Sequence, residues 1–139
     1  MQNPIIVALD VPSTQKALKL AEELASVVGA FKVGKQLFVS GGPDVVRKLR
    51  GLGAKIFIDL KFHDIPNTVA KAVQSATDLG VDMLTVHASG GSEMLSAAES
   101  AGHEQAAMLR SEPPLILGVT VLTSMDDANL AELGIDESA

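Results

Sequence analysis

The feature that most constrains the fold of this chain is a set of five short apolar runs at similar spacing. Each run is rich in Val, Ile and Leu, and the first residues of successive runs lie 26, 24, 28 and 32 positions apart. Runs of this length and composition are typical of strands that are buried on both faces of a parallel sheet. The predicted strands are Ile5–Leu9, Phe31–Gly34, Lys55–Leu60, Met83–His87 and Leu115–Leu122.

Between the runs, the apolar residues follow a helical period instead. Four segments carry one apolar stripe each, with Ser, Thr or Pro near the start and, in the first three, Gly just past the end. The predicted helices cover about 14–28, 43–52, 66–79 and 92–109. The pair Pro113-Pro114 then stops the fourth helix and introduces the fifth strand.

This alternation predicts an α/β fold, with right-handed crossovers that place helices outside a parallel sheet. An open doubly wound sheet and part of a (β/α)8 TIM barrel both satisfy the pattern. The unit size favours the barrel, in which eight units take about 250 residues. Residues 1–139 are therefore expected to form one partial barrel domain with about the first five strands and four helices. Strands one and five would lack barrel neighbours, and 126–139 would form a loop and the start of a helix.

Composition excludes several classes of function. The chain has 139 residues, a net charge of −6 and no cysteine, so it has no disulfide framework and no thiolate metal site. It has no basic patch suited to nucleic acid, no secretory signal pattern and no apolar run of the ~20 residues that span a bilayer. No His pair has helical ligand spacing, so no metal site is expected. We therefore expect a cytoplasmic protein without nucleic-acid or membrane partners.

The strongest chemical feature is the segment Asp59–Asp64, at the carboxyl end of the third predicted strand. Residues two apart on a strand point to the same face, so Asp59 and Lys61 are expected to face the barrel interior together, with Asp64 in the following loop. Barrel enzymes carry their active sites at this end of the strands. A lysine between carboxylates should remain protonated and could deliver a proton. The alternative is a solvated strand end without catalytic function.

Two further charged residues belong to the same end of the predicted sheet. Asp10 ends the first strand and Lys32 lies within the second. An Asp at a strand end is more often a turn residue, but a lysine inside an apolar strand needs a partner because an unpaired buried ammonium is costly. Thr123 follows the fifth strand and is expected either to bind a ligand or to cap the next segment.

The run from Asp59 to Thr68, Asp-Leu-Lys-Phe-His-Asp-Ile-Pro-Asn-Thr, is similar to the signature of the orotidine 5'-phosphate decarboxylases. The core of that signature is Asp-x-Lys-x-x-Asp, and the Ile-Pro-Asn-Thr continuation makes the match more specific. Other segments agree in order, and the resemblance spans essentially all 139 residues and is closest to bacterial members. These segments are Val7–Asp10, Lys32–Lys35, Val86–Gly91 and Val119–Met125.

The resemblance implies decarboxylation of orotidine 5'-phosphate to UMP in pyrimidine biosynthesis, with neither metal nor organic cofactor. It implies three catalytic residues: Lys61 as proton donor to C6, Asp59 beside the departing carboxylate, and Asp64 holding the lysine array across a dimer interface. It also implies a homodimer with shared active sites, in which Thr68 comes from the partner subunit. The implied substrate-binding residues are Asp10, Lys32, Ile65, Thr68 and Thr123.

Two alternatives remain open at this point. Sugar-phosphate decarboxylases and hexulose-phosphate synthases of the same barrel group share Asp-x-Lys-x-x-Asp but use magnesium, and the residues around the motif favour the orotidine enzyme. A non-catalytic half-barrel is the second alternative, because the family's phosphate-binding glutamine and arginine belong to later barrel loops. For the same reason, we expect the 139-residue chain to be an incomplete catalyst by itself.

Overall fold

The computed structural model describes residues 3–135. These residues alternate strictly between strands and helices, apart from one short 3-10 helix after the fourth strand. In chain order the elements are β1 (Ile6–Ala8), α1 (Thr14–Leu24), β2 (Ala30–Gly34), α2 (Lys35–Gly51), β3 (Ile56–Phe62), α3 (Pro66–Asp78), β4 (Met83–His87), η1 (Ala88–Gly90), α4 (Gly91–Leu109), β5 (Leu115–Val119) and α5 (Asp127–Glu132).

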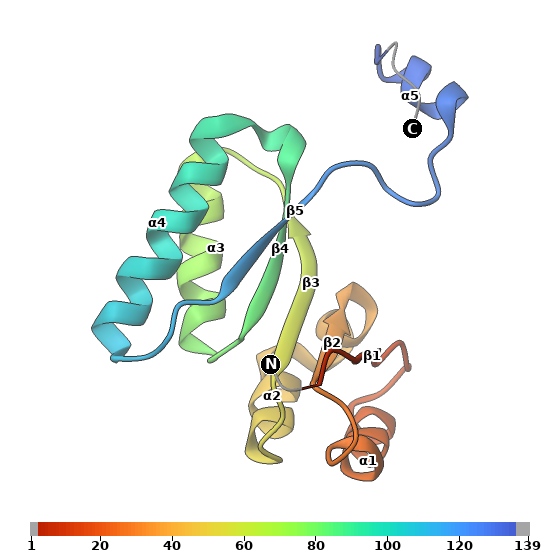
Figure 1. Ribbon diagram of the computed structural model, residues 1–139, viewed down its shortest axis with the longest axis vertical. Helices are drawn as coiled ribbons and strands as arrows, with labels where there is room; N and C mark the ends of the chain where they lie inside the picture. Colours follow the sequence, from red (N-terminus) through yellow and green to blue (C-terminus); the bar gives the residue numbers. More distant parts are fainter. Residues whose placement is uncertain (1–2, 136–139) are drawn as a thin grey trace.

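The five strands form one parallel sheet in the order β1-β2-β3-β4-β5. A doubly wound sheet reverses its strand order at a switch point, and this sheet does not. In Figure 1, α3 and α4 lie side by side along β4 and β5, whereas α1 and α2 lie beside the first strands. This sequential order is the wall of a (β/α) barrel, so the prediction of a partial barrel is confirmed.

One hydrophobic core lies between the strands and helices α1 to α4. In β3, Ile56 and Ile58 are buried, whereas the intervening Phe57 and Asp59 are only half-buried. Burial of each large aliphatic side chain contributes about 1.5–3 kcal/mol, so this face of β3 is fixed against the helices. The alternation leaves the opposite face of the strand for polar side chains.

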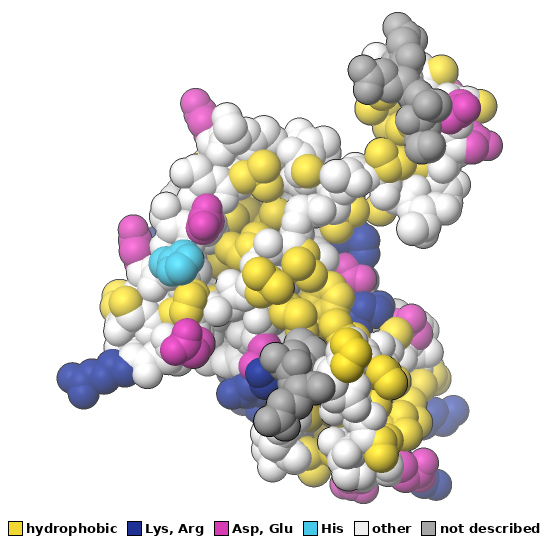
Figure 2. Space-filling view, viewed as in Figure 1, with side chains coloured by type: hydrophobic (Ala, Val, Ile, Leu, Met, Phe, Trp, Pro, Cys, Tyr) yellow, Lys and Arg dark blue, Asp and Glu magenta, His cyan; other side chains and the backbone are white. Residues whose placement is uncertain are grey.

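The edge strands are exposed, as expected for strands without barrel neighbours. Ile6 in β1 is 38% exposed and Leu115 in β5 is 58% exposed. Both strands lie at the edges of the described sheet, each with one paired neighbour. Figure 2 shows hydrophobic side chains gathered in the middle of one face of the molecule, between the two pairs of helices.

Helix α2 differs from the prediction, which placed its start at Pro43. It begins at Lys35 and is kinked at Gly42, whose φ of 59° and ψ of −166° are not helical. The prediction places the helix start at Pro43, a residue typical of the first helical turn, and therefore omits the preceding turns. Helix α1 ends at Leu24, earlier than expected, whereas β4 has the predicted bounds.

No helix within 3–135 is both long and apolar enough to cross a membrane.

Candidate active site

Four charged side chains meet where β1, β2 and β3 approach their carboxyl ends. Pairing of Ala8 with Lys32 continues in a hydrogen bond from the Leu9 amide to the Lys32 carbonyl, which brings the chain at Asp10 beside β2. Pairing of Gly34 with Asp59 sets β3 in register with β2. The strand register therefore brings Asp10, Lys32, Asp59 and Lys61 to one place, although they come from three separate strand units.

These four residues form a chain of alternating charge, here called the charge array. The Lys32 Nζ atom lies 3.4 Å from Asp10 Oδ1 and 3.5 Å from Asp59 Oδ2. The Lys61 Nζ atom donates a hydrogen bond of 2.7 Å to Asp59 Oδ1. Asp59 is the least accessible member, with 15% of its side chain exposed, whereas the Asp10 side chain is 66% exposed. The array thus contains one carboxylate that is largely shielded from solvent, Asp59, and one that is accessible to a ligand, Asp10.

Two opposing effects act on Asp59. Burial raises the pKa of its carboxyl group, but hydrogen bonds from Lys61 and Thr85 and the positive charges of Lys61 and Lys32 outweigh burial, so the pKa lies below its ordinary value. Asp59 is therefore ionised at neutral pH. An ionised Asp59 can hold two ammonium groups in fixed positions, which is what a site that stabilises developing negative charge requires.

Lys61 itself has an unusual backbone. Ile58 pairs with Leu84 and Phe62 pairs with Val86, so β3 advances by four residues while β4 advances by two. In this bulge Lys61 has a φ of 54°, a left-handed conformation that costs an L-residue about 1–2 kcal/mol. The 2.7 Å contact between Lys61 Nζ and Asp59 Oδ1 shows that the two side chains still meet on one side of the sheet. Bulges and backbone strain of this kind concentrate beside functional sites, where they aim a side chain.

Thr85 is a site residue that sequence reasoning missed. It lies in β4, is 5% exposed, and its hydroxyl accepts a 2.9 Å hydrogen bond from the Lys61 amide. The same hydroxyl donates a 3.0 Å hydrogen bond to Asp59 Oδ1. The only sequence signal was a hydroxyl side chain inside an otherwise apolar strand, two residues before His87.

Two histidines lie at the same end of the sheet. The rings of His63 and His87 are 5.1 Å apart between centroids. Burial lowers the pKa of His87, and the charges of His63, Lys35 and Lys61 lower that pKa further. Lys35, the first residue of α2, thus lies near Lys61 at the carboxyl end of the sheet, where lysines and acidic residues gather together.

The other predicted site residues lie outside the charge array. Asp64, Ile65 and Thr68 are exposed in and after the loop that follows β3, and Asp64 Oδ1 accepts a 2.7 Å hydrogen bond from the Ile65 amide. Thr123 is also exposed, between β5 and α5. The capping interpretation of Thr123 is wrong, because Asp126 caps α5 through a hydrogen bond from the Asn129 amide. Its ligand-binding role stays a prediction.

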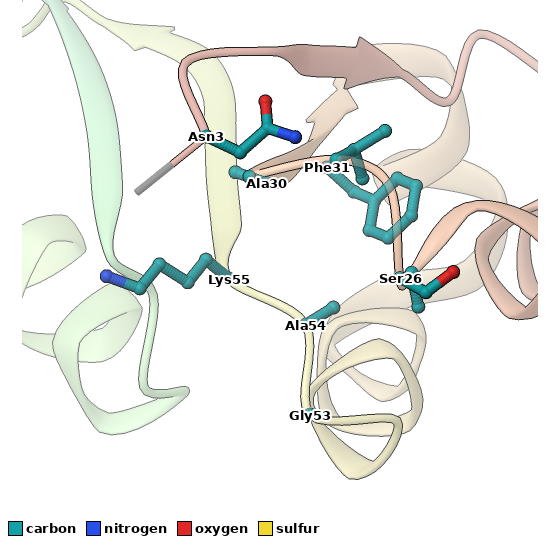
Figure 3. Close-up of a pocket in the computed structure, with 10 residues that line it drawn as sticks. Asn3, Ser26, Ala30, Phe31, Gly53, Ala54 and Lys55 are labelled. Atoms are coloured by element: carbon teal, nitrogen blue, oxygen red, sulfur yellow. The ribbon is translucent and has the colours of Figure 1, made fainter. Parts of the chain in front are cut away.

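A hollow of about 530 Å³ lies at the opposite, amino-terminal end of the strands. Its lining includes Asn3, Ser26 and Phe31, and among the described residues that line it Lys55 alone is ionisable. Figure 3 shows the Lys55 side chain extending away from Phe31 and Ser26. This hollow therefore offers no group aimed at a reacting atom, and the charge array is the candidate active site.

Known proteins match this chain along nearly its whole length. An orotidine 5'-phosphate decarboxylase from Carboxydothermus hydrogenoformans is 50% identical over 134 residues, which are 96% of this chain and 55% of that protein. One from Syntrophotalea carbinolica is 53% identical over 132 residues, 95% of this chain and 54% of that protein. The crystal structure of the Lactobacillus acidophilus enzyme of the same name has a TM-score of 0.81 at 38% identity, covering 98% of this chain and 61% of that one.

The chain thus spans about half the length of the curated relatives it matches. A family model described as "Orotidine 5'-phosphate decarboxylase / HUMPS family" matches residues 3–139. With the sequential parallel sheet and the Asp-x-Lys-x-x-Asp motif at the carboxyl end of β3, the chain belongs to the orotidine 5'-phosphate decarboxylase / HUMPS family.

Proposed function

We propose that a complete barrel containing this chain converts orotidine 5'-phosphate to UMP in pyrimidine biosynthesis, in the cytoplasm and without a cofactor. The single observation that carries the proposal is the Lys61 ammonium group, held 2.7 Å from Asp59 in an array of alternating charge. The proposal concerns the complete barrel because residues 1–139 correspond to about half of the relatives.

In the proposed reaction, the bond between C6 of the pyrimidine and its carboxylate breaks and CO2 leaves. The electron pair stays on C6, where a simple pyrimidine delocalises it poorly. The fixed ammonium of Lys61 stabilises this developing negative charge and then donates a proton to C6, which completes UMP. The resulting neutral amine regains a proton from solvent. Asp59 orients Lys61 through their short hydrogen bond and lies beside the departing carboxylate.

Substrate binding draws on the exposed end of the array and on its charge. The accessible carboxylate of Asp10 can accept hydrogen bonds from ribose hydroxyls, and Lys32 can donate to them. We assign Thr123 to contacts with the base. Lys35 adds positive charge near the same strand ends, which favours an anionic nucleotide over a neutral sugar.

We also propose that the barrel acts as a homodimer with shared sites. Asp64, Ile65 and Thr68 are exposed, and Ile65 is 66% exposed although it is a large apolar side chain. Exposed apolar residues beside polar ones suit a contact with a second subunit. In the dimer, Asp64 would reach the partner's lysine array, and Ile65 and Thr68 would contribute to the partner's substrate site.

The hydrogen bonds and ion pairs of Asp59 favour this reaction over the magnesium-dependent alternative. Asp59 Oδ1 accepts hydrogen bonds from Lys61 and Thr85, and Asp59 Oδ2 pairs with Lys32. A divalent cation bound to this carboxylate would have to lie beside two ammonium groups, which repel it. The carboxylate is better suited to orienting lysine than to binding magnesium.

The test uses a completed barrel, in which residues 1–139 are joined to the remaining part of the Carboxydothermus hydrogenoformans relative. UMP formation is followed in the presence of a metal chelator for the unmodified barrel, Lys61→Met and Lys55→Met. We expect Lys61→Met to lower kcat by about 10²–10⁴-fold, as for removal of a general acid. Lys55→Met, at the amino end, should retain full turnover.

Three results would count against the proposal. Near-normal turnover in Lys61→Met would remove Lys61 from the mechanism. UMP formation that stops in the chelator and returns with magnesium would contradict a reaction without a cofactor. A folded completed barrel that binds UMP but does not turn over substrate would favour the non-catalytic interpretation.

Shared sites are tested separately with mixed dimers of the completed barrel. A subunit with Asp64→Ala is combined with one with Lys61→Met, and the mixed species is purified through two different affinity tags. If sites are shared, one of the two sites in the mixed dimer is intact, and about half of the unmodified activity should return. Verified mixed dimers without activity would place Asp64 outside the partner's site.

A further inference from the structure

We infer that Thr85 is a positioning residue for the proposed reaction: its hydroxyl fixes the strand bulge that aims Lys61 at the reacting carbon and orients Asp59 at the same time. The inference rests on the proposed function and extends it to a residue on a different strand, β4.

Three hydrogen bonds close a ring around Thr85. The Lys61 amide donates to Thr85 Oγ1 at 2.9 Å, Thr85 Oγ1 donates to Asp59 Oδ1 at 3.0 Å, and Lys61 Nζ donates to the same Oδ1 at 2.7 Å. The backbone of Lys61 is therefore held by Thr85 and its ammonium group by Asp59, and these two partners are bonded to each other. The single threonine oxygen connects the position of the lysine main chain to the position of its counter-ion.

A hydroxyl is suited to this place because the bulge interrupts the regular hydrogen-bond ladder between β3 and β4. β3 advances four residues against two of β4 between the pairs Ile58–Leu84 and Phe62–Val86, so the regular ladder is interrupted there. The Lys61 amide instead finds its acceptor in the Thr85 side chain. A hydroxyl has one donor and two lone pairs, so it can accept from this amide and donate to Asp59 simultaneously.

Burial raises the energetic cost of losing these hydrogen bonds. Thr85 is 5% exposed, so water has little access to replace the hydroxyl. A buried amide without an acceptor is costly, and the left-handed conformation of Lys61 is itself unfavourable for an L-residue. Without the Thr85 hydroxyl, the bulge should relax toward ordinary strand geometry and displace the lysine side chain. A displacement of about 1 Å at a reacting group can lower turnover by about 10²-fold.

The experiment compares three variants of the completed barrel. Thr85→Val keeps the shape of the side chain and removes the hydroxyl, whereas Thr85→Ser keeps the hydroxyl. The matched control is Thr77→Val, because Thr77 is 3% exposed and its hydroxyl donates to the Val73 carbonyl within α3, away from the charge array. We expect Thr85→Val to lower kcat by about ten- to hundred-fold with little change in KM. Thr85→Ser should regain most of kcat, and Thr77→Val should not lose it.

Crystal structures of the same variants supply a readout that does not depend on turnover. In Thr85→Val, we expect Lys61 to leave its positive φ or its ammonium group to separate from Asp59; in Thr85→Ser, both should stay. If Thr85→Val does not fold, Thr85→Cys replaces it, because a thiol is a weak donor and acceptor of similar size.

Full kcat in Thr85→Val or Thr85→Cys would overturn the inference, as would an equal loss in Thr85→Ser or an unchanged Lys61 geometry without the hydroxyl. Failure of the proposed function is distinguishable, because it appears as turnover in Lys61→Met. In that case the crystal structures still decide whether Thr85 holds the bulge.

Discussion

The two ends of the same five strands differ in the kind of side chain they present. At the amino end, a hollow is lined by small and apolar residues, with Lys55 directed away from Phe31 (Figure 3). At the carboxyl end, the charge array holds three ion pairs among Asp10, Lys32, Asp59 and Lys61. The candidate active site of this molecule is therefore identified by its ion pairs and not by the volume of a hollow.

Strand β2 contributes side chains both to the hydrophobic core and to the charge array. Phe31 is 1% exposed in the core, and the next residue, Lys32, points to the other face and joins the array. In barrel enzymes, residues at the carboxyl ends of strands serve catalysis and those at the amino ends serve stability. The comparison therefore predicts that substitutions at the two ends affect different measurements.

The largest expected effect is at the amino end. Phe31→Ala should lower the free energy of unfolding of the completed barrel by about 3–5 kcal/mol, because it removes a fully buried aromatic side chain and leaves a cavity. Urea unfolding measures the change, and kcat per folded molecule should stay near the unmodified value. A loss of kcat without a loss of stability would break the division between the two ends.

The next effect is at the carboxyl end. Asp59→Asn should lower kcat by about 10²–10³-fold, because a neutral amide cannot hold two ammonium groups in place as the carboxylate does. Steady-state kinetics at neutral pH, with the urea midpoint measured in parallel, separate activity from stability. Turnover within a factor of about two of the unmodified barrel would show that the array is not part of the reaction.

Two glycines give a smaller, matched contrast. Gly53, at the amino end, has a φ of +78°, so Gly53→Ala should lower the free energy of unfolding by about 1–2 kcal/mol and leave kinetics unchanged. A Cβ at Gly34 would lie 3.3 Å from Asp10 Oδ1 and 3.4 Å from Lys32 Nζ. Gly34→Ala should therefore raise KM a few-fold, in keeping with displacement of one ribose contact. Equal stability effects and equal KM in both variants would contradict the contrast.

The smallest effect concerns pH. The pKa of Asp59 is lowered in the folded state, so its ion pairs stabilise the fold above the ordinary carboxyl pKa of about 4 and lose that contribution as pH falls through the lower folded value. Because the group is partly exposed, we expect less than about 1 kcal/mol. Urea unfolding from pH 6 to pH 2 should show a steeper loss of stability in the unmodified barrel than in Asp59→Asn. Parallel curves would contradict the prediction.

Much of the fold followed from local patterns. The apolar runs located all five strands, and β4 has the predicted bounds, because burial imposes consecutive Val, Ile and Leu on a parallel strand. The first half of α2 is absent from the prediction because Pro43, which follows the kink at Gly42, is a residue typical of helix starts. Exposure of Ile6 and Leu115 agrees with the expectation that strands one and five lack barrel neighbours.

The candidate site was likewise predicted only in part. Asp59 and Lys61 were identified from their spacing, and the register of the neighbouring strands brings Asp10 and Lys32 to them. The left-handed backbone of Lys61 had no signal, because lysine does not favour a positive φ and the bulge depends on a partner strand. Thr85 was missed for the same reason: its role exists only once β3 and β4 are paired.

The most direct test of the role of Lys61 is a crystal structure of the completed barrel with UMP bound. We predict that the pyrimidine lies over the charge array, with Lys61 Nζ within about 3–3.5 Å of C6 and Asp10 and Lys32 against the ribose. A nucleotide bound in the amino-terminal hollow between Asn3 and Phe31, or a Lys61 ammonium group directed into solvent while UMP is present, would contradict it.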